Sequence, residues 1–160
     1  MFGWPTWLLV ALVIVLGGVV TLALLSAFSR RPDTLGVRDG RLAPCPATPN
    51  CVCTRAEDAG HRIAPLTYEG AAADALARLR RVVIVRPGVR LVAETETYLR
   101  AEFVSRVFRF VDDVEFLLDP ERRVIHFRSA SRAGRSDFGV NRRRMEGIRR
   151  AFTERRKEEG

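Results

Sequence analysis

Lysine is almost absent from this 160-residue chain. Of its 27 lysine and arginine residues, only Lys157 is a lysine. The formal net charge of +8 is therefore carried by arginine, whose planar and permanently charged fork suits carboxylates, phosphates and membrane surfaces. The arginines are scattered, as in proteins from GC-rich genomes, and form no continuous tract. Zinc-finger spacing and stacking aromatics are missing too, so nucleic-acid binding is not predicted.

Catalytic and metal-binding signatures are missing as well. No glycine pattern of a nucleophile elbow surrounds Ser129 or Ser131. The acidic residues lack EF-hand spacing, and the three cysteines, with no histidine nearer than His61, do not match a usual zinc finger. His126 stands alone in a strand pattern and is interpreted as a structural residue of a sheet. The sequence predicts no metal and no cofactor, and it leaves open whether the protein is an enzyme.

Charge is absent from residues 7–28, a run of 22 residues. A helix of this length spans about 33 Å, which matches the roughly 30 Å hydrocarbon core of a bilayer. A cleaved secretory signal is the alternative, but the run lacks a basic start and exceeds the usual apolar region of about 7 to 15 residues. We predict an N-terminal tail over 1–6, a single transmembrane helix over 7–28, a linker over 29–41 and a folded domain over 42–157.

Two features favour opposite sides of a membrane for this domain. The arginines that follow the apolar run are Arg30, Arg31, Arg38 and Arg41. Only the terminal amine precedes the run, so the positive-inside bias favours the cytoplasm. A short proline-rich segment contains the three cysteines Cys45, Cys51 and Cys53. Such a segment closes a disulfide in an oxidising compartment, with reduced packing cysteines and a Cys3His metal site as alternatives.

The pattern of the domain predicts an α+β fold. Residues 70–82 carry an apolar stripe at helical spacing, and period-two alternation follows over 91–94, 98–106, 108–118 and 124–131. An Asp-Pro-Glu-Arg turn at 119–122 joins the last two strands. The final helix is expected to place Phe138, Met145, Ile148 and Phe152 on one buried face. We predict an antiparallel sheet of about four strands with flanking helices and one covered face.

A polar run between the last strand and the final helix is the candidate site. Alternation places Ser129 and Ser131 on the apolar face of the strand and Arg128 on the other face. On the preceding strand, Asp113 and Glu115 share one face. If the hairpin pairs these two strands, the acidic and basic clusters come close together.

Seven residues of this run are predicted to form the most specific surface, with three acidic partners. The seven are Arg128, Ser129, Ser131, Arg132, Asp137, Asn141 and Arg142, and the partners are Asp112, Asp113 and Glu115. In one interpretation, three of the arginines (Arg128, Arg132 and Arg142) bind a small anionic group, and the carboxylates orient them or accept protons. In the other, the charges form an internal salt-bridge network. Asp137 is expected either to cap the final helix or to face a ligand.

Three motifs in this order resemble an uncharacterised family, that of domain of unknown function 1499, which occurs in bacteria and photosynthetic eukaryotes. The motifs are Cys-Pro-Ala-Thr-Pro-Asn-Cys-Val at 45–52, Asp-Asp-Val-Glu-Phe at 112–116, and Arg-Ser-Ala-Ser-Arg at 128–132 with Ser-Asp-Phe-Gly-Val-Asn-Arg at 136–142. The resemblance covers nearly everything from about Leu42 to Phe152 and leaves the apolar run outside. No established activity comes with it.

The resemblance also implies a location and a disulfide. Family members often carry an export signal, a lipid attachment or a membrane segment, which implies an extracytoplasmic domain. The family pattern usually has serine where this chain has Cys53. This departure implies a bond between Cys45 and Cys51 and leaves Cys53 as the odd thiol.

We therefore expect a single-pass protein of the bacterial inner membrane, held in the lipid bilayer by residues 7–28. Its domain is expected on the periplasmic side, with the cytoplasmic side as the alternative. The expected function is a noncatalytic, envelope-associated binding module for a small anionic ligand. The alternative is a hydrolase-like or other enzyme that uses Asp113 or Glu115 as acid or base beside an arginine pocket.

Overall fold

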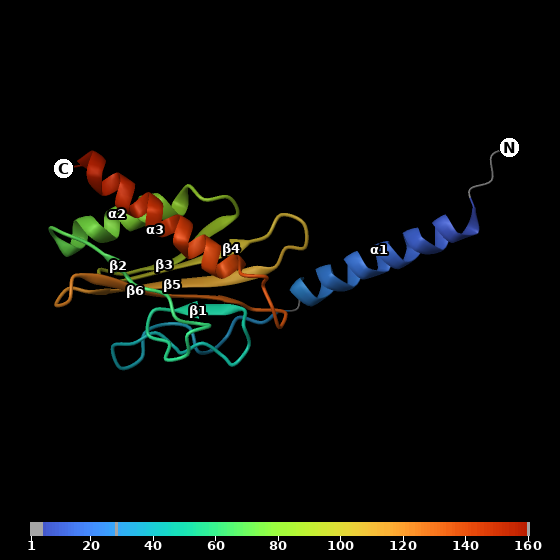
Figure 1. Ribbon diagram of the computed structural model, residues 1–160, viewed down its shortest axis with the longest axis horizontal. Coiled ribbons are helices and arrows are strands. Elements are labelled where there is room, and N and C mark those ends of the chain that lie inside the picture. Colours follow the sequence, from blue (N-terminus) through green and yellow to red (C-terminus); the bar gives the residue numbers. More distant parts are fainter. Residues whose placement is uncertain (1–4, 28, 160) are drawn as a thin grey trace.

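The domain is built on a six-stranded antiparallel sheet, and a separate helix precedes it (Figure 1). This computed structural model describes residues 5–27 and 29–159, without the side chains of 23, 25–27 and 156–159. In chain order the elements are α1 (Thr6–Ala27), β1 (Cys51–Cys53), β2 (Leu66–Thr67), α2 (Ala72–Ile84), β3 (Val89–Glu94), β4 (Tyr98–Val104), β5 (Val111–Asp119), β6 (Val124–Ser131) and α3 (Val140–Glu159). The predicted α+β class with an antiparallel sheet is confirmed.

The sheet has six strands instead of about four, because the sequence pattern does not reveal β1 and β2. These strands have three and two residues, which is too short for alternation to be recognised. Both pair with β6, and the strand order of the main path is β1-β6-β5-β4-β3. The predicted hairpin at 119–122 joins β5 to β6, so that Glu115 lies opposite Arg128.

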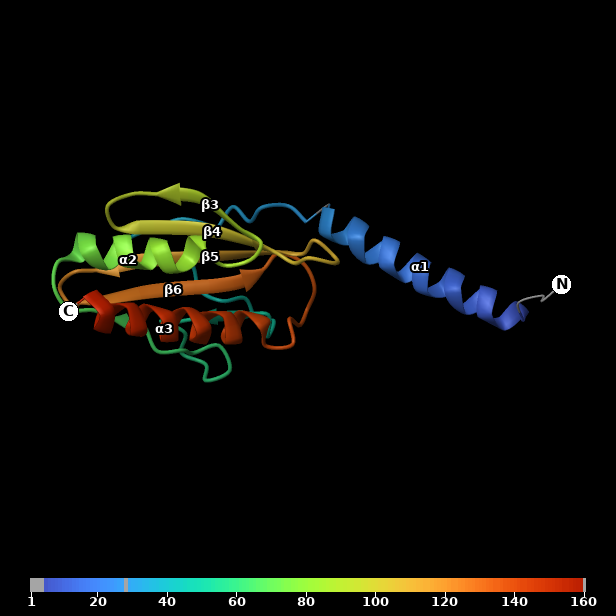
Figure 2. The same cartoon turned by 90° about the horizontal axis from the view of Figure 1, so that it is seen from above.

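The hydrophobic core lies between the sheet and the pair of helices α2 and α3, which cover the same face (Figure 2). Phe116 of β5 and Phe127 of β6 are fully buried at its centre, with their ring centroids 6.3 Å apart. Ile148 and Phe152 of α3 pack into the same cluster. Complete burial of one such side chain stabilises the fold by about 1.5 to 3 kcal/mol, so this face provides much of the driving force for folding.

The prediction for Phe138 is wrong. Met145, Ile148 and Phe152 are buried as expected, but Phe138 is 86% exposed. The reason is that α3 begins only at Val140, and Phe138 precedes it with a φ of +52°. A helical periodicity extended past the true start of a helix assigns such a residue to the wrong face.

The second face of the sheet is covered too, which corrects the expectation of a single covered face. The chain between α1 and β1 crosses this face, below the sheet in Figure 1. The backbone N–H of Gly36 donates a 2.7 Å hydrogen bond to Glu115, and Arg128 donates one of 3.3 Å to the carbonyl of Pro44. A disulfide joins Cys45 to Cys51, and Cys53 is a buried free thiol. The cover is therefore bonded to the sheet at Gly36 and Pro44 and, through the disulfide, at Cys45.

The N-terminal helix α1 occupies the segment that was predicted to cross a membrane, apart from Phe28, which lies outside the described residues. Over residues 5–27 and 29–159, no helix is long and apolar enough to cross a membrane. The prediction of a helix in this segment is confirmed, and the prediction that it spans a bilayer is not supported.

Opening the disulfide is expected to destabilise the domain. The bond joins two residues that are six positions apart. Closing a loop of this size stabilises the folded state relative to the unfolded one by about 2 kcal/mol. The variant with Cys45→Ser and Cys51→Ser should lose about this much in urea unfolding, and Cys53→Ser is the matched control. Labelling of the unreduced, urea-unfolded protein should modify one thiol, and modification of three would contradict the bond.

Candidate functional site

The residues of the predicted site divide between the two faces of the sheet. Ser129 of β6 contacts Asn141 of α3 on the helical face, whereas Arg132 contacts Asp113 on the opposite face. Alternation along a strand is the cause, since neighbouring side chains point to opposite faces. The sequence correctly predicts which residues share a face, but it does not predict that the set forms more than one site.

Asn141 is the centre of a buried polar network on the helical face. Its Nδ2 donates to the backbone carbonyl of Asn50 at 3.1 Å and to Oγ of Ser131 at 3.0 Å. Its Oδ1 accepts hydrogen bonds from Ser129 at 2.5 Å and from Arg144 at 2.6 Å. These four bonds join Asn141 to Ser129 and Ser131 of β6, to Asn50 before β1 and to Arg144 of the same helix, and none is left for a ligand.

Arg144 extends this network to the carboxylate of Asp112. Nη2 of Arg144 lies 2.5 Å from Oδ2 of Asp112, and its guanidinium lies over the ring of Phe103 at 4.7 Å from the centroid. Asp112 is thus on the helical face, apart from the other two predicted acidic partners. Sequence analysis did not single out Arg144, although it follows Asn141 by three residues on the same helical face.

Asp137 and Arg142 fix the start of α3. Oδ2 of Asp137 accepts a 2.7 Å hydrogen bond from the backbone N–H of Asn141, and Oδ1 accepts one of 3.0 Å from that of Gly139. Asp137 therefore caps the helix, as one of its two interpretations predicted. Arg142 donates to the carbonyls of Gly60 at 2.8 Å and Arg62 at 3.1 Å. It does not join the other predicted arginines.

On the opposite face, Arg132 is held by two carboxylates. Its Nε and Nη2 both bind Asp113 at 2.7 Å, and Nη2 also lies 2.5 Å from Oε1 of Glu102. The hydrogen bonds to Asp113 raise the pKa of Arg132, burial opposes them, and Glu102 adds to the increase. Asp113 thus has both oxygens engaged by one planar fork, a geometry that fixes its orientation.

Glu102 connects this pair to the edge of the sheet. Its Oε2 also accepts two hydrogen bonds from Arg90, at 3.2 Å from Nε and 2.5 Å from Nη2. Burial raises the pKa of Glu102, but the hydrogen bonds from Arg132 and Arg90 outweigh burial and place the pKa below its ordinary value of 4.5. Glu102 is therefore charged at neutral pH.

Glu115 is completely buried and lies between two arginines. It pairs across the strands with Arg100 of β4 and Arg128 of β6. Its Oε1 accepts hydrogen bonds from the hydroxyl of Tyr98 at 2.8 Å and from the N–H of Gly36. Burial, followed by the charge of Glu115, raises the pKa of Tyr98, which keeps this hydroxyl protonated as a donor.

The remaining oxygen of Glu115 is only loosely compensated. Oε2 lies 3.6 Å from Nη1 of Arg128, and within the described part of the chain it has no hydrogen-bond donor. Nε of the buried Arg100 also lacks an acceptor among those residues. A buried polar atom without a partner is unfavourable by about 1 to 3 kcal/mol, so the centre of this ionic layer is not fully satisfied.

A cavity of about 380 Å³ lies beside this ionic layer and under the covering segment. It is lined by Pro32, Thr34, Ala43, Pro44, Cys45, Pro46, Asp113, Arg128, Ala130, Ser131 and Arg132. Arg128 and Arg132 are the only cationic side chains in this lining. The structure thus brings together two of the three arginines predicted to bind an anion, and one of the predicted acidic partners.

The contribution of β4 to this layer is not among the features predicted from the sequence. Tyr98, Arg100 and Glu102 alternate with the core residues Leu99 and Ala101 along the strand. This alternation was a recognisable signal, because three polar side chains on one face of a central strand must lie either in water or against a polar partner.

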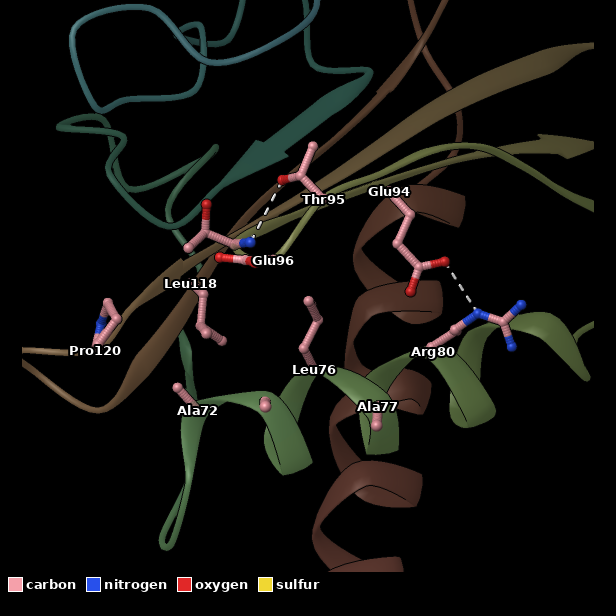
Figure 3. A pocket seen from close by; sticks show the side chains of 11 residues that line it. Ala72, Leu76, Ala77, Arg80, Glu94, Thr95, Glu96, Leu118 and Pro120 are labelled. Carbon is pink, nitrogen blue, oxygen red and sulfur yellow. Dashed lines mark hydrogen bonds and ion pairs between the residues drawn. The ribbon is translucent and has the colours of Figure 1, made fainter.

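A larger groove of about 700 Å³ lies elsewhere, between α2 and the turn that joins β3 to β4 (Figure 3). Its floor includes Leu76 and Leu118, and its rim carries Arg80, whose Nε lies 3.0 Å from Glu94. Arg80 is paired with Glu94, and the predicted site residues do not line this groove. Size alone therefore does not mark it as the functional site.

These observations define a class of protein: a small α+β domain with an apolar core under two helices and a buried ionic layer under a disulfide-bonded cover. The chain belongs to the family described as "Protein of unknown function (DUF1499)", which it matches over residues 41–152. The match includes the disulfide and every predicted site residue, and α1 lies outside it. No curated protein and no solved structure matches the chain.

Replacing Asn141 by alanine should weaken the attachment of α3. The variant leaves buried partners of four hydrogen bonds unsatisfied, so we expect it to lower the free energy of unfolding by about 3 kcal/mol. Arg150→Ala, at an exposed position of the same helix, is the control and should change it by less than about 0.5 kcal/mol. Equal urea midpoints for the two variants would contradict the structural role of Asn141.

The lowered pKa of Glu102 predicts a loss of stability in acid. In the unfolded chain this carboxyl titrates near its ordinary value of 4.5, and in the folded protein it titrates lower. Its contribution to stability is therefore complete above that value and is lost as the pH falls through the folded pKa. The difference in free energy of unfolding between the wild type and Glu102→Gln should shrink from pH 7 toward pH 3, and parallel pH profiles would show that Glu102 is not the group responsible.

Proposed function

We propose that this protein is a membrane-attached binding module, and that its ligand is a small carboxylate held by Arg128. The observation that carries this proposal is the incomplete bonding of the Arg128 guanidinium in the wall of the cavity. Its only hydrogen bond within the described residues runs from Nε to Pro44, and the nearest carboxylate oxygen is 3.6 Å away. A planar guanidinium with so few hydrogen bonds is suited to bind both oxygens of a carboxylate.

The charge balance of the layer favours a singly charged ligand. The buried arginines on this face are Arg100, Arg128 and Arg132, and the buried carboxylates are Glu102, Asp113 and Glu115. These six charges cancel, and Arg90, whose side chain is largely exposed, adds one positive charge at the edge. A monoanion leaves the layer neutral, whereas a doubly charged phosphate would add an uncompensated charge at low local dielectric.

The walls of the cavity favour a short apolar portion on the same ligand. Pro44 and Pro46 of the covering segment and Ala130 of β6 face the space beside Arg128. Apolar walls around a few convergent polar groups are the usual composition of a small-molecule site. A carboxylate with a short aliphatic chain satisfies both features.

The contacts favour this binding role over the acid–base alternative. Both oxygens of Asp113 are bonded to Arg132, and Glu115 has no exposed surface. A general acid or base must come within hydrogen-bond reach of the group with which it exchanges a proton. The two carboxylates are better suited to orient Arg132 and Arg128.

The membrane part of the proposal rests on α1. Residues 7–28 contain no charged side chain, and large apolar side chains of α1 such as Val13 and Ile14 are exposed. Such a continuous apolar surface is unfavourable in water and is typical of segments that meet lipid or another apolar partner. We propose that this segment anchors the domain to the bacterial inner membrane as a single-pass helix.

The proposed side of the membrane is the periplasm. The disulfide between Cys45 and Cys51 supports an oxidising compartment, because cytosolic thiols are usually kept reduced. The arginines after the apolar run favour the other side, but scattered arginine is general in this sequence and carries less weight than a formed disulfide.

The ligand proposal is tested with hexanoate as the probe and with Arg128→Lys as the variant. Lysine keeps the charge beside Glu115 but removes the planar fork, so the fold should persist while affinity falls by at least about tenfold. Saturation-transfer NMR measures the binding. Arg150→Lys, at an exposed position of α3 outside the cavity, is the matched control and should bind hexanoate as the wild type does.

Equal hexanoate binding by the wild type and Arg128→Lys, or no binding by either, would refute the ligand proposal. Loss of stability without any ligand effect would instead mean that the ionic layer is purely structural. Inorganic phosphate should bind more weakly than hexanoate if the charge balance selects a monoanion.

Membrane attachment is tested by carbonate extraction of the full chain expressed in bacteria. We expect the protein to stay in the membrane pellet, because the apolar run is held by the hydrocarbon core and not by charge. A variant with Leu12→Arg and Leu16→Arg should move to the supernatant. Release of the wild type by carbonate would contradict anchoring. A reporter fused after Gly160 identifies the side, with periplasmic activity expected.

A further inference from the structure

We propose that one end of the domain rests on an anionic lipid surface through two loops, residues 105–110 between β4 and β5 and residues 132–139 between β6 and α3. We call these the basal loops. The proposal deepens the membrane attachment proposed above and rests on it. Anchoring alone leaves the orientation of the domain free, and the basal loops select one orientation.

The strand register places both loops at the same end of the sheet. Val104 pairs with Val111 across the first loop, and Asp112 pairs with Ser131 at the start of the second. The chain that leaves α1 reaches this end too, since Pro32 lines the same cavity as Ser131. Figures 1 and 2 agree, because in both views the two loops lie next to the end of α1 that joins the domain.

The basal loops expose apolar side chains that the fold does not need to expose. Phe138 is 86% exposed and Val107 is 74% exposed. The conformation of Phe138 is fixed, with its N–H bonded to Oγ of Ser136 at 3.3 Å and its carbonyl bonded to Arg143 at 2.8 Å. Its φ of +52° is uncommon for a bulky residue. A rigid loop that presents an aromatic ring to the outside is typical of an interaction surface.

The charge of the basal loops is positive. Arg106, Arg109 and Arg135 are exposed there, and the first loop contains no acidic residue. The only acid in the second loop is Asp137, whose oxygens are bonded to backbone N–H groups. The opposite end of the sheet is different, because its turns expose Glu96 and Glu121 as well as arginines. The domain therefore has a basic, apolar end on the side of α1.

An anionic bilayer surface matches this combination better than a protein partner does. Phenylalanine and aliphatic side chains on a membrane-bound surface enter the boundary between headgroups and acyl chains, and each arginine near an anionic surface strengthens binding by about fivefold. Phe138 and Val107 would enter the interface while the three arginines bind headgroup phosphates. The connection to α1 places this surface within a few residues of the proposed anchor, so no long linker has to be spanned.

A fluorescent probe at the loop tests the contact. In the full chain with Trp4→Phe and Trp7→Phe, which removes both native tryptophans, Phe138→Trp provides the probe. Glu121→Trp provides the matched control at the opposite end of the sheet. Both proteins are reconstituted in nanodiscs of phosphatidylcholine, with or without phosphatidylglycerol and with or without acyl-chain bromination, and carbonate-resistant attachment is checked on each sample.

We expect brominated lipid to quench the probe at position 138 at least about twofold more than the control at position 121, because only the former lies at the interface. Phosphatidylglycerol should increase this quenching, and Arg106→Gln with Arg109→Gln should abolish the increase. Equal quenching of both probes in attached protein would overturn the loop proposal and leave the anchor intact. Shielding of position 138 from aqueous acrylamide without lipid quenching would overturn it in favour of a protein contact. Loss of attachment itself would refute the anchor.

Discussion

Burial of ionised side chains on a sheet face is the constraint on which the rest of this structure depends. Glu115 has no exposed surface and lies between Arg100 and Arg128. A buried charge is tolerated only when partners surround it and water is replaced by donors. The segment between α1 and β1 supplies such a donor, since the N–H of Gly36 donates a hydrogen bond to Glu115. Its Pro44 carbonyl accepts a hydrogen bond from Arg128. Without this cover the ionic layer would be open to water and the cavity beside it would have no outer wall.

The two faces of the sheet therefore perform different tasks with residues that alternate along the same strands. One face carries the apolar core and, at its end, the Asn141 network that attaches α3. The other carries the ionic layer, in which Arg132 is hydrogen-bonded to Asp113 and Glu102, whereas Arg128 has no carboxylate oxygen closer than 3.6 Å. The contrast between two arginines four residues apart explains why one acts as a structural ion pair and the other is the candidate for a ligand.

The proposed ligand site and the proposed lipid contact lie at related positions. The lining of the cavity includes Pro32, which belongs to the chain after α1, and Arg132, which is the first residue of the second basal loop. A domain resting on the basal loops would hold this cavity near the lipid headgroups. The two proposals therefore describe one arrangement of the domain, although each can fail separately.

The sequence alone determined the class of fold, the helix in the N-terminal apolar run, the pairing of β5 with β6, and which side chains of β6 share a face. These features depend on local periodicity and on one turn, which are readable within a short window. It did not determine the short strands β1 and β2, the cover on the second face, the exposure of Phe138, or the separation of the predicted site residues into more than one site. The short strands and the cover depend on contacts between residues far apart in the sequence, such as Gly36 with Glu115, and Phe138 is exposed because α3 begins only at Val140. Only the tertiary structure decided that Arg128 and Arg132, and not the whole arginine-rich run, border a cavity, because alternation assigns a direction to a side chain but does not identify what lies opposite it.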